Sequence, residues 1–371
     1  MSNDTHPSRR AVTQGLLAAA LASQAAAASQ EVHLFVGTYA SPNGGLFPLT
    51  YRPAGDEWIL GQPDKSIVNA SFGTYSKRFD VHYLLDEQKV GQVGAYRCSN
   101  GTWTRLGGVP TNGSSPCYVS LDRAERCMVV ANYDSGSIGF CRLDPKSGMP
   151  SAAEMHQDRG SGPNKDRQEG PHAHWARFSP DQTLLYTIDL GADRVFAYPF
   201  DPKNSRLGPV FAAYEAPPGS GPRHMVFHPR LPITYLASEL AGTLTVLRRM
   251  PDGTLSRQQM LSALPAGFTA HNQTAHIAID RRGRRVYVSN RGHNSIAIFD
   301  IAADGRATAA GHVPTGGDWP RYFLLMEDHR RLVVANERSG DLVVFELARD
   351  GGLVPSGRKL AVPRPAFLAQ V

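Results

Sequence analysis

Hydrophobic and polar residues alternate along most of this chain, in short runs that are separated by turns. In "CYVSLDRAERCMVVANYDSGSIGFCRL", which begins at Cys117, apolar runs are separated by Asp, Asn, Gly and Ser. Alternation with a period of two indicates β-strands with one buried face, and the residues between the runs are typical of tight turns. The stretch therefore predicts three consecutive strands joined by two turns.

The same pattern recurs along the chain. Copies begin at Ser71, Cys117, His174, Arg223, Ala275 and Arg321, of which the first is the weakest match. The residues that enter the first turn lie 46 to 57 positions apart in successive copies: Ser76, Asp122, Ser179, His228, Asp280 and Met326. A repeat of about fifty residues that is made of short strands predicts a β-propeller.

The two ends of the chain complete the count of blades. Residues 365–371, "PAFLAQV", match the opening strand of a repeat, and residues 33–51 match a second and third strand that lack a first. Pairing the two ends in one blade would close the ring and remove exposed sheet edges. We therefore predict an all-β fold, a seven-bladed β-propeller over residues 29–371 with one blade shared between the N- and C-terminal strands.

Residues 1–28 have a different character. Arg9 and Arg10 precede a short Ala/Leu stretch that ends in Ala-x-Ala at Ala26–Ala28. This resembles a twin-arginine (Tat-like) signal peptide and predicts a periplasmic or secreted protein; the alternative is a mis-assigned start or a simple tail. No other apolar stretch approaches the roughly 18 residues of a membrane span, so no membrane contact is expected after removal of the signal.

Composition narrows the class of function. Apolar residues make up 41% and charged residues 19%, which excludes a disordered chain. The net charge of +6 is spread without long like-charged runs, which favours small anionic substrates and argues against nucleic acid. The four cysteines show no metal-binding spacing, and Cys127 with Cys141 is only a weak disulfide candidate. We expect no metal or cofactor, and a monomer or weak homodimer.

In a propeller the first strand of each blade lines the central channel, so equivalent positions form rings. One ring consists of Ser71, Cys117, His174, Arg223, Ala275, Arg321 and Ala366. A second ring, just after the second strands, consists of Tyr39, Glu87, Tyr133, Leu190, Glu239, Arg291 and Glu337. Both rings vary between copies while the surrounding pattern repeats, so we expect Arg223 to face a water-filled channel.

These residue types suit the chemistry of an anionic substrate. Arginine binds carboxylate or phosphate in a bidentate manner, and His or Glu can activate a water. The candidate catalytic residues are His174, Arg223, Glu239 and Arg291, and the candidate substrate-binding residues are Arg321, Glu87, Glu337, His172 and His276. The alternative for each is structural: a hydrogen-bonded histidine, an arginine on strand carbonyls, or a glutamate in a salt bridge.

Several motifs carry a family resemblance. "RQEGPHAH" (167–174), "GPRHMVFHP" (221–229), "SNRGHNSIAIF" (289–299) and the stretch 319–347 resemble the seven-bladed propeller lactonase family. That family includes bacterial propeller-type 6-phosphogluconolactonases and fungal carboxymuconate lactonising enzymes. The resemblance covers essentially the whole chain after residue 28.

The resemblance implies lactone hydrolysis in the channel without a cofactor, by His174, by Arg223 and Glu239 sixteen residues apart, and by Arg291. Either His174 or Glu239 would activate the water, and Glu239 is favoured because Arg223 should keep it ionised. Two features depart from the family pattern: an export signal does not suit a phosphorylated cytoplasmic substrate, and His276 stands where relatives often carry an acidic residue.

Two other functions remain open at this point. A muconate-type cycloisomerase would need the same proton donor and anion-binding groups. A non-catalytic periplasmic propeller could hold a ligand in its channel, since the fold alone does not imply an enzyme.

Overall fold

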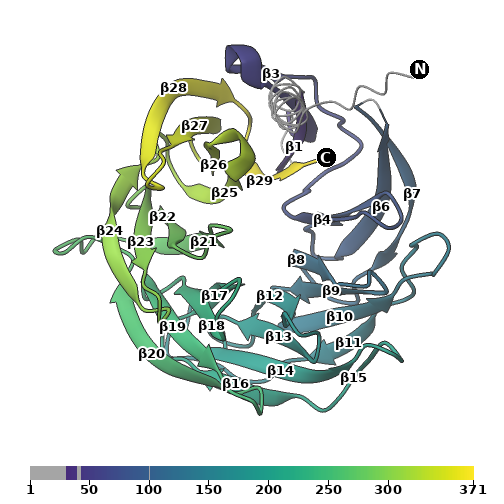
Figure 1. The fold of residues 1–371 in the computed structure, drawn as a ribbon. Coiled ribbons are helices and arrows are strands. Elements are labelled where there is room, and N and C mark those ends of the chain that lie inside the picture. The colour runs from purple at the N-terminus through teal and green to yellow at the C-terminus, as the bar shows by residue number, and fades with distance from the viewer. Residues whose placement is uncertain (1–30, 40–42, 100) are drawn as a thin grey trace, which may run out of the picture.

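The computed structural model describes residues 31–39, 43–99 and 101–371, which form seven antiparallel sheets around a central channel (Figure 1). Only two short 3₁₀ helices, η1 (Pro53–Gly55) and η2 (Glu327–His329), interrupt the strands of these residues. The all-β, seven-bladed propeller predicted from the repeat is confirmed. The signal peptide predicted at residues 1–28 lies outside the described residues.

Each blade begins at the channel and ends at the rim. From the inside outwards, the first blade consists of β4 (Gly73–Ser76), β5 (Val81–Asp86), β6 (Gln92–Ser99) and β7 (Thr102–Pro110). The second consists of β8 (Pro116–Leu121), β9 (Cys127–Asn132), β10 (Ser137–Arg142) and β11 (Glu154–Gln157). The third consists of β12 (Ala173–Phe178), β13 (Leu184–Asp189) and β14 (Arg194–Asp201), and both β15 (Arg206–Leu207) and β16 (Phe211–Glu215) pair with β14. The fourth blade consists of β17 (Pro222–Phe227), β18 (Ile233–Ser238), β19 (Thr243–Arg249) and β20 (Leu255–Ser262). The fifth consists of β21 (Gln273–Ile279), β22 (Arg285–Arg291), β23 (Ser295–Ile301) and β24 (Ala307–Pro314). The sixth consists of β25 (Pro320–Met326), β26 (Arg331–Asn336), β27 (Asp341–Leu347) and β28 (Leu353–Ala361).

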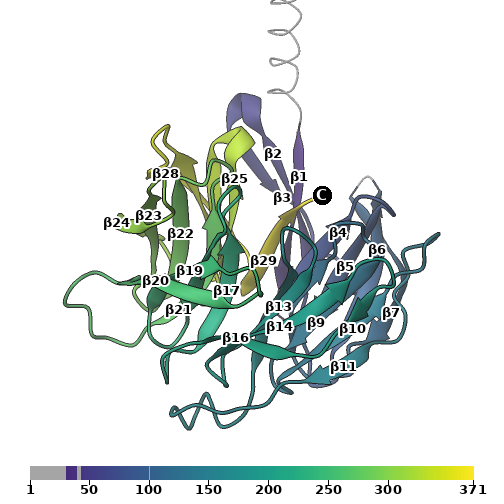
Figure 2. The same ribbon diagram turned by 60° about the horizontal axis from the view of Figure 1, so that its bottom comes forward.

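The seventh blade joins the two ends of the chain. Its strand order is β29 (Pro365–Gln370), β1 (Val32–Thr38), β2 (Leu46–Arg52) and β3 (Glu57–Leu60), so the last strand of the chain lies innermost. β29 and β1 run antiparallel, with Phe35 opposite Ala369, and Figure 2 shows them side by side. This is the predicted composite blade, and it closes the ring by pairing the last strand of the chain with the first.

The innermost strands are not regular, and the irregularity lies at the predicted ring. In five blades one residue of the innermost strand is extra and unpaired, because its two neighbours pair with consecutive residues of the second strand. The extra residues are Cys117, His174, Arg223, Arg321 and Ala366. A β-bulge re-aims a side chain at a sheet edge or beside a functional site. Arg223 therefore does not interrupt a regular buried strand, because it occupies a bulge.

Neighbouring blades are joined by apolar packing and by a repeated hydrogen bond. A buried tyrosine in the second strand donates its hydroxyl to the carbonyl of a glycine in the outer turn of the next blade. The pairs are Tyr83 with Gly148, Tyr186 with Gly253, Tyr235 with Gly305 and Tyr287 with Gly351. The repeat in the sequence thus includes the contacts between blades as well as the strands.

The cysteines and the apolar segments add no further structure. Cys98, Cys117, Cys127 and Cys141 are all free, so the Cys127–Cys141 pair suggested by the hairpin is not bonded. In the part of the chain that the structure describes, no helix is long and apolar enough to cross a bilayer.

Candidate active site

The predicted charged residues meet at one end of the channel. The first strand of each blade begins there and the second strand ends there, so the two predicted rings adjoin. Arg223 comes from the bulge in β17, Glu239 follows β18 of the same blade, and Arg291 ends β22 of the next blade. All three side chains are buried. Segments far apart in the chain thus contribute to a single charged cluster.

Glu239 lies at the centre of this cluster and faces three arginines. Its Oε2 atom lies 2.9 Å from Arg223 Nε and 2.7 Å from Arg291 Nη2, and its Oε1 atom lies 2.6 Å from Arg167 Nη2. The Arg223 contact is an ion pair without the alignment of a hydrogen bond, because its Nε forms no hydrogen bond with any of the described residues. Three guanidinium groups around one carboxylate leave an excess of positive charge.

The protonation states follow from burial and from this charge. Burial by itself would raise the pKa of Glu239, but Arg291, Arg223 and Arg167 outweigh it and hold the pKa well below its usual value. Burial, together with the charge of Arg291, lowers the pKa of Arg223 to about 9. Glu239 is therefore ionised at neutral pH, and Arg223 still carries its proton. An additional anion would relieve the repulsion between the arginines.

His174 lies beside the cluster on β12. Its Nδ1 atom is 3.6 Å from Cys117 Sγ, and its ring stands edge-on to the rings of Tyr133 and His224, with centroids 5.4 Å and 5.1 Å away. Burial, and next the charge of Arg223, lowers the pKa of His174 well below its usual value, so the ring is neutral at pH 7. Its Nε2 atom hydrogen-bonds to no described residue, and it is therefore available to a water or a substrate.

Arg167 belongs to the site although the ring positions did not include it. It lies in the long loop between β11 and β12, and besides Glu239 its Nη2 donates to the Tyr133 hydroxyl at 3.0 Å. The loop is anchored by Gln168, a fully buried residue whose amide donates to the Leu190 carbonyl at 2.9 Å. Arg167 is the first residue of the motif "RQEGPHAH", which could have indicated its importance. The comparison of repeats did not include Arg167, because it aligned only the strands and the residues directly next to them.

His172 supports this loop and does not touch Glu239. Its ring stacks on Tyr133 with centroids 4.6 Å apart, and its Nδ1 lies 3.0 Å from the Tyr133 carbonyl oxygen. His172, which the sequence suggested as a substrate-binding residue, is therefore linked to Arg167 only through Tyr133.

Three other predicted residues, on the β4 and β25 blades, form a second charged cluster together with Tyr39 and Arg364 beside the composite blade. Arg321 Nη2 lies 3.7 Å from Glu87 Oε2, which accepts a hydrogen bond from the Tyr39 hydroxyl at 3.1 Å. Glu337 pairs with Arg364 at 3.1 Å. Burial would lower the pKa of Arg321, but Tyr39, Glu87 and Glu337 outweigh it and raise the pKa. Here the acids and bases balance, in contrast to the Glu239 cluster.

His276 lies deeper in the channel than either cluster. Its Nδ1 is 3.3 Å from Nδ1 of His224, and His224 in turn lies 3.3 Å, by its Nε2, from Arg223 Nη1. Burial, followed by the charges of Arg223 and Arg177, lowers the pKa of His276 to about 3. His276 therefore reaches the Glu239 cluster through a single intervening side chain, that of His224.

Known proteins resemble the chain over almost its whole length. A family model described as "Lactonase, 7-bladed beta-propeller" matches residues 33–369. A 6-phosphogluconolactonase of Bacillus subtilis is 32% identical over 78% of this chain and 84% of its own, and one of Formosa agariphila is 29% identical over 79% and 86%. A periplasmic gluconolactonase of Pseudomonas aeruginosa superposes with a TM-score of 0.84 at 27% identity, covering 92% of this chain and 99% of its own. The chain therefore belongs to the family of seven-bladed β-propeller lactonases.

Proposed function

We propose that this lactonase hydrolyses an anionic sugar or sugar-acid lactone at the Glu239 cluster. The observation that carries the proposal is the excess of positive charge there, with three arginines paired to one buried carboxylate. A carboxylate or phosphate on the substrate supplies the missing negative charge. The names of the relatives, 6-phosphogluconolactonase and gluconolactonase, support a sugar lactone as the substrate class.

Arg167 and Arg291 are the proposed anion-binding residues. The Arg167 side chain is 28% exposed, whereas that of Glu239 is 2% exposed, so Arg167 is the arginine that an incoming substrate meets first. In the free enzyme Glu239 acts as an internal counter-ion that holds the guanidinium groups in position. When the substrate binds, its anionic group replaces Glu239 as the acceptor of some of the hydrogen bonds that the arginines donate.

His174 is the proposed general base, in place of the Glu239 that the sequence favoured. Both carboxylate oxygens of Glu239 are already paired with arginines, whereas His174 has a ring nitrogen that no described residue occupies. His174 takes a proton from water as the oxygen attacks the lactone carbonyl, and Arg223 stabilises the oxyanion. The ring C–O bond then breaks, and His174 returns its proton to the leaving alkoxide. Glu239 stabilises the transient imidazolium.

A pH-stat assay on a panel of lactones tests this function. The panel contains glucono-δ-lactone and 6-phosphogluconolactone, with a muconate as the cycloisomerase substrate. Arg223→Ala should lower kcat/KM about 10²-fold or more, because it removes an oxyanion donor. Arg306→Gln, at a side chain that is 67% exposed, is the matched control and should keep full activity. Equal rates for wild type and Arg223→Ala would refute the assignment, and muconate turnover alone would select the cycloisomerase.

Two isosteric variants separate the base from the counter-ion. His174→Gln should lower kcat with little change in KM, because the substrate anion is bound by arginines. Glu239→Gln should instead change KM and kcat together, because it frees the arginines and disturbs their positions. If Glu239→Gln alone abolished kcat while His174→Gln kept it, Glu239 would be the base.

Export is the remaining proposal. Arg9 and Arg10 before a short Ala/Leu stretch support a twin-arginine signal, and one similar structure is described as periplasmic. An unphosphorylated sugar-acid lactone that carries a carboxylate would suit both that compartment and the arginines. Cell fractionation with Arg9→Lys/Arg10→Lys should show the protein shift from periplasm to cytoplasm; unchanged fractionation would argue against twin-arginine export.

A further inference from the structure

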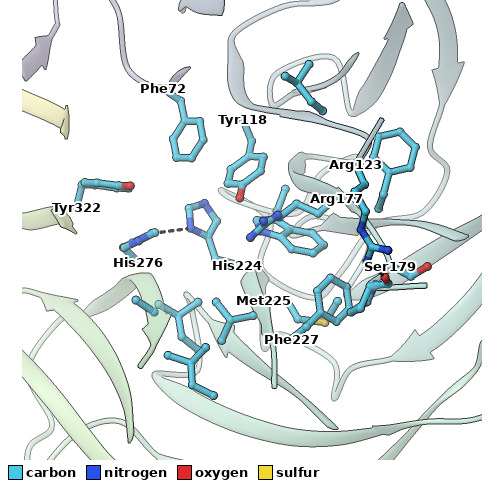
Figure 3. Close-up of a pocket in the computed structure, with 18 of the residues that line it drawn as sticks. Phe72, Tyr118, Arg123, Arg177, Ser179, His224, Met225, Phe227, His276 and Tyr322 are labelled. Carbon is cyan, nitrogen blue, oxygen red and sulfur yellow. Dashed lines mark hydrogen bonds between the residues drawn. The ribbon is translucent and has the colours of Figure 1, made fainter. Parts of the chain in front are cut away.

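The channel has a second chamber at the end opposite to Glu239. The inner strands run away from the Glu239 cluster, and their last residues, such as Leu121, Phe178 and Ile279, line a cavity of about 590 Å³. The turn between β12 and β13, with Ser179 and Gln182, forms part of its rim. Figure 3 shows the side chains that point into it. This volume is typical of sites for small organic ligands.

A layer of side chains separates this chamber from the Glu239 cluster. His224 and His276 lie side by side across the channel, and Tyr322 packs on His276 with ring centroids 4.1 Å apart (Figure 3). Tyr118 stands edge-on to His224 at 5.4 Å. The described residues that line the chamber include none of the residues that pair with Glu239. The chamber is therefore a separate site with its own opening.

The walls of the chamber are aromatic. The rings that line it are Phe72, Tyr118, Trp175, Phe178, Phe227 and Tyr322. Phe72 and Tyr118 already stack on each other, with centroids 4.2 Å apart. Aromatic walls favour a flat ligand, since ring faces and edges make their best contacts with another planar group.

The charge of the chamber is positive. Arg123 and Arg177 line it, and no described residue of its lining is Asp or Glu. Arg177 interacts with Tyr118, and it forms no ion pair with a carboxylate of the described residues. Figure 3 shows Arg123 and Arg177 at the cavity. The nearby Asp181 is occupied by Ser179 and Thr183, whose hydroxyls donate to it at 2.5 Å and 2.9 Å. An unpaired guanidinium beside a tyrosine hydroxyl suits a carboxylate.

We propose that this chamber is a second binding site, specific for a small aromatic carboxylate. The rings of Phe72, Phe227 and Tyr322 surround the flat body of the ligand, and Arg177 binds its carboxylate with help from the Tyr118 hydroxyl. Burial and Arg223 keep the pKa values of His224 and His276 low, so these rings are neutral and close the chamber without adding charge. The site is independent of lactone hydrolysis.

Isothermal titration calorimetry with 2-naphthoate tests the proposal, with neutral 2-naphthamide as the matched probe. Wild type should bind one 2-naphthoate, and should bind the amide at least about tenfold more weakly, because the amide cannot form the charge-assisted pair. Arg177→Gln should weaken binding of the carboxylate by about tenfold or more. Arg306→Gln, an exposed arginine far along the chain in the β23–β24 turn, should bind as wild type does.

A variant of the other cluster locates the ligand. Arg167→Gln should leave 2-naphthoate affinity unchanged, because Arg167 does not line the chamber. Arg123→Gln is a second chamber variant should Arg177→Gln fold poorly, and it too should weaken binding. No binding by wild type, equal affinity in folded Arg177→Gln and Arg123→Gln, or a loss of affinity in Arg167→Gln would each overturn the proposal.

Discussion

At the scale of single residues, the site depends on side chains that leave the regular strand geometry. Bulges release His174 and Arg223 from the ladder of backbone hydrogen bonds, and a loop brings Arg167 onto Glu239 from 72 positions away in the chain. Because a bulge adds one residue to the inner strand, two consecutive side chains, Arg223 and His224, can both be buried at the channel.

The proposed role of Arg167 predicts a change in substrate affinity. Arg167→Gln should raise KM for 6-phosphogluconolactone about tenfold or more, because one charge-assisted hydrogen bond to the anion is lost. KM for glucono-δ-lactone, which carries no charge, should change less. Steady-state kinetics on both substrates would check this, and an equal change in the two KM values would contradict an anion-binding role.

A buried pair of carboxyl groups beneath the same loop predicts a pH dependence of stability. Asp158 and Asp189 are both buried, and Asp189 Oδ1 accepts backbone hydrogen bonds from His172 at 2.8 Å and Ala192 at 2.7 Å. Burial, and next the charge of Asp189, raises the pKa of Asp158 well above its usual value. The folded protein thus binds a proton more tightly than the unfolded chain, so this contribution to stability is full below about pH 4 and is lost as pH rises through the folded pKa.

Asp158→Asn should remove the loss of stability with rising pH that Asp158 causes, because the amide does not ionise. The variant should be more stable than wild type at pH 8, and the advantage should shrink at pH 5. Urea unfolding at the two pH values measures the difference, with Asp166→Asn, an exposed position of the same loop, as control. Parallel pH dependence of wild type and Asp158→Asn would show that the pair is not protonated in the folded protein.

At the scale of elements, the blades depend on contacts that repeat with the sequence. Tyr235 is fully buried, and its hydroxyl donates to the carbonyl of Gly305, 2.9 Å away in the next blade. Gly305 has φ of 87°, a conformation in which a side chain would be strained. The glycine turn of one blade and the tyrosine of the preceding blade thus form one inter-blade contact.

Tyr235→Phe should lower the free energy of unfolding by about 1–2 kcal/mol, because it leaves a buried carbonyl without a partner. Tyr75→Phe is the matched control: Tyr75 is 39% exposed and its hydroxyl contacts Asp80 within its own blade, so its removal should cost less. Denaturant titration of both variants would decide, and equal losses would show that the inter-blade contact adds nothing.

At the scale of the whole molecule, stability depends on closing the ring through the composite blade. Deleting residues 365–371 removes β29 and leaves the backbone groups of β1 exposed at the channel. We expect a lower Tm and a tendency to aggregate, and a peptide "PAFLAQV" added in trans should raise the Tm again. Deletion of Val371 alone, which lies beyond β29, should have little effect. A wild-type Tm after the full deletion would mean that closure is not required.

The sequence by itself determined the number of blades, the composite seventh blade and the placement of His174, Arg223, Glu239 and Arg291 near one another. Strand periodicity and repeat spacing are local properties, and the symmetry of a propeller converts equal repeat positions into equal heights in the channel. The sequence did not predict that Arg321, Glu87 and Glu337 form a second cluster. The alignment of the repeats predicts how far along the channel a residue lies, but not which of its neighbours it pairs with.

Only the tertiary structure decided the remaining features of the site. Arg167 lies in a loop outside the repeat, so its contact with Glu239 has no periodic signal. The sequence favoured Glu239 as the base because one arginine was counted. Three arginines surround Glu239, and we therefore propose His174 instead, because the charge at a site is a sum over groups from different blades. Likewise, the contact between His224 and His276 beside the channel cavity depends on distances between strands that no single stretch of sequence contains.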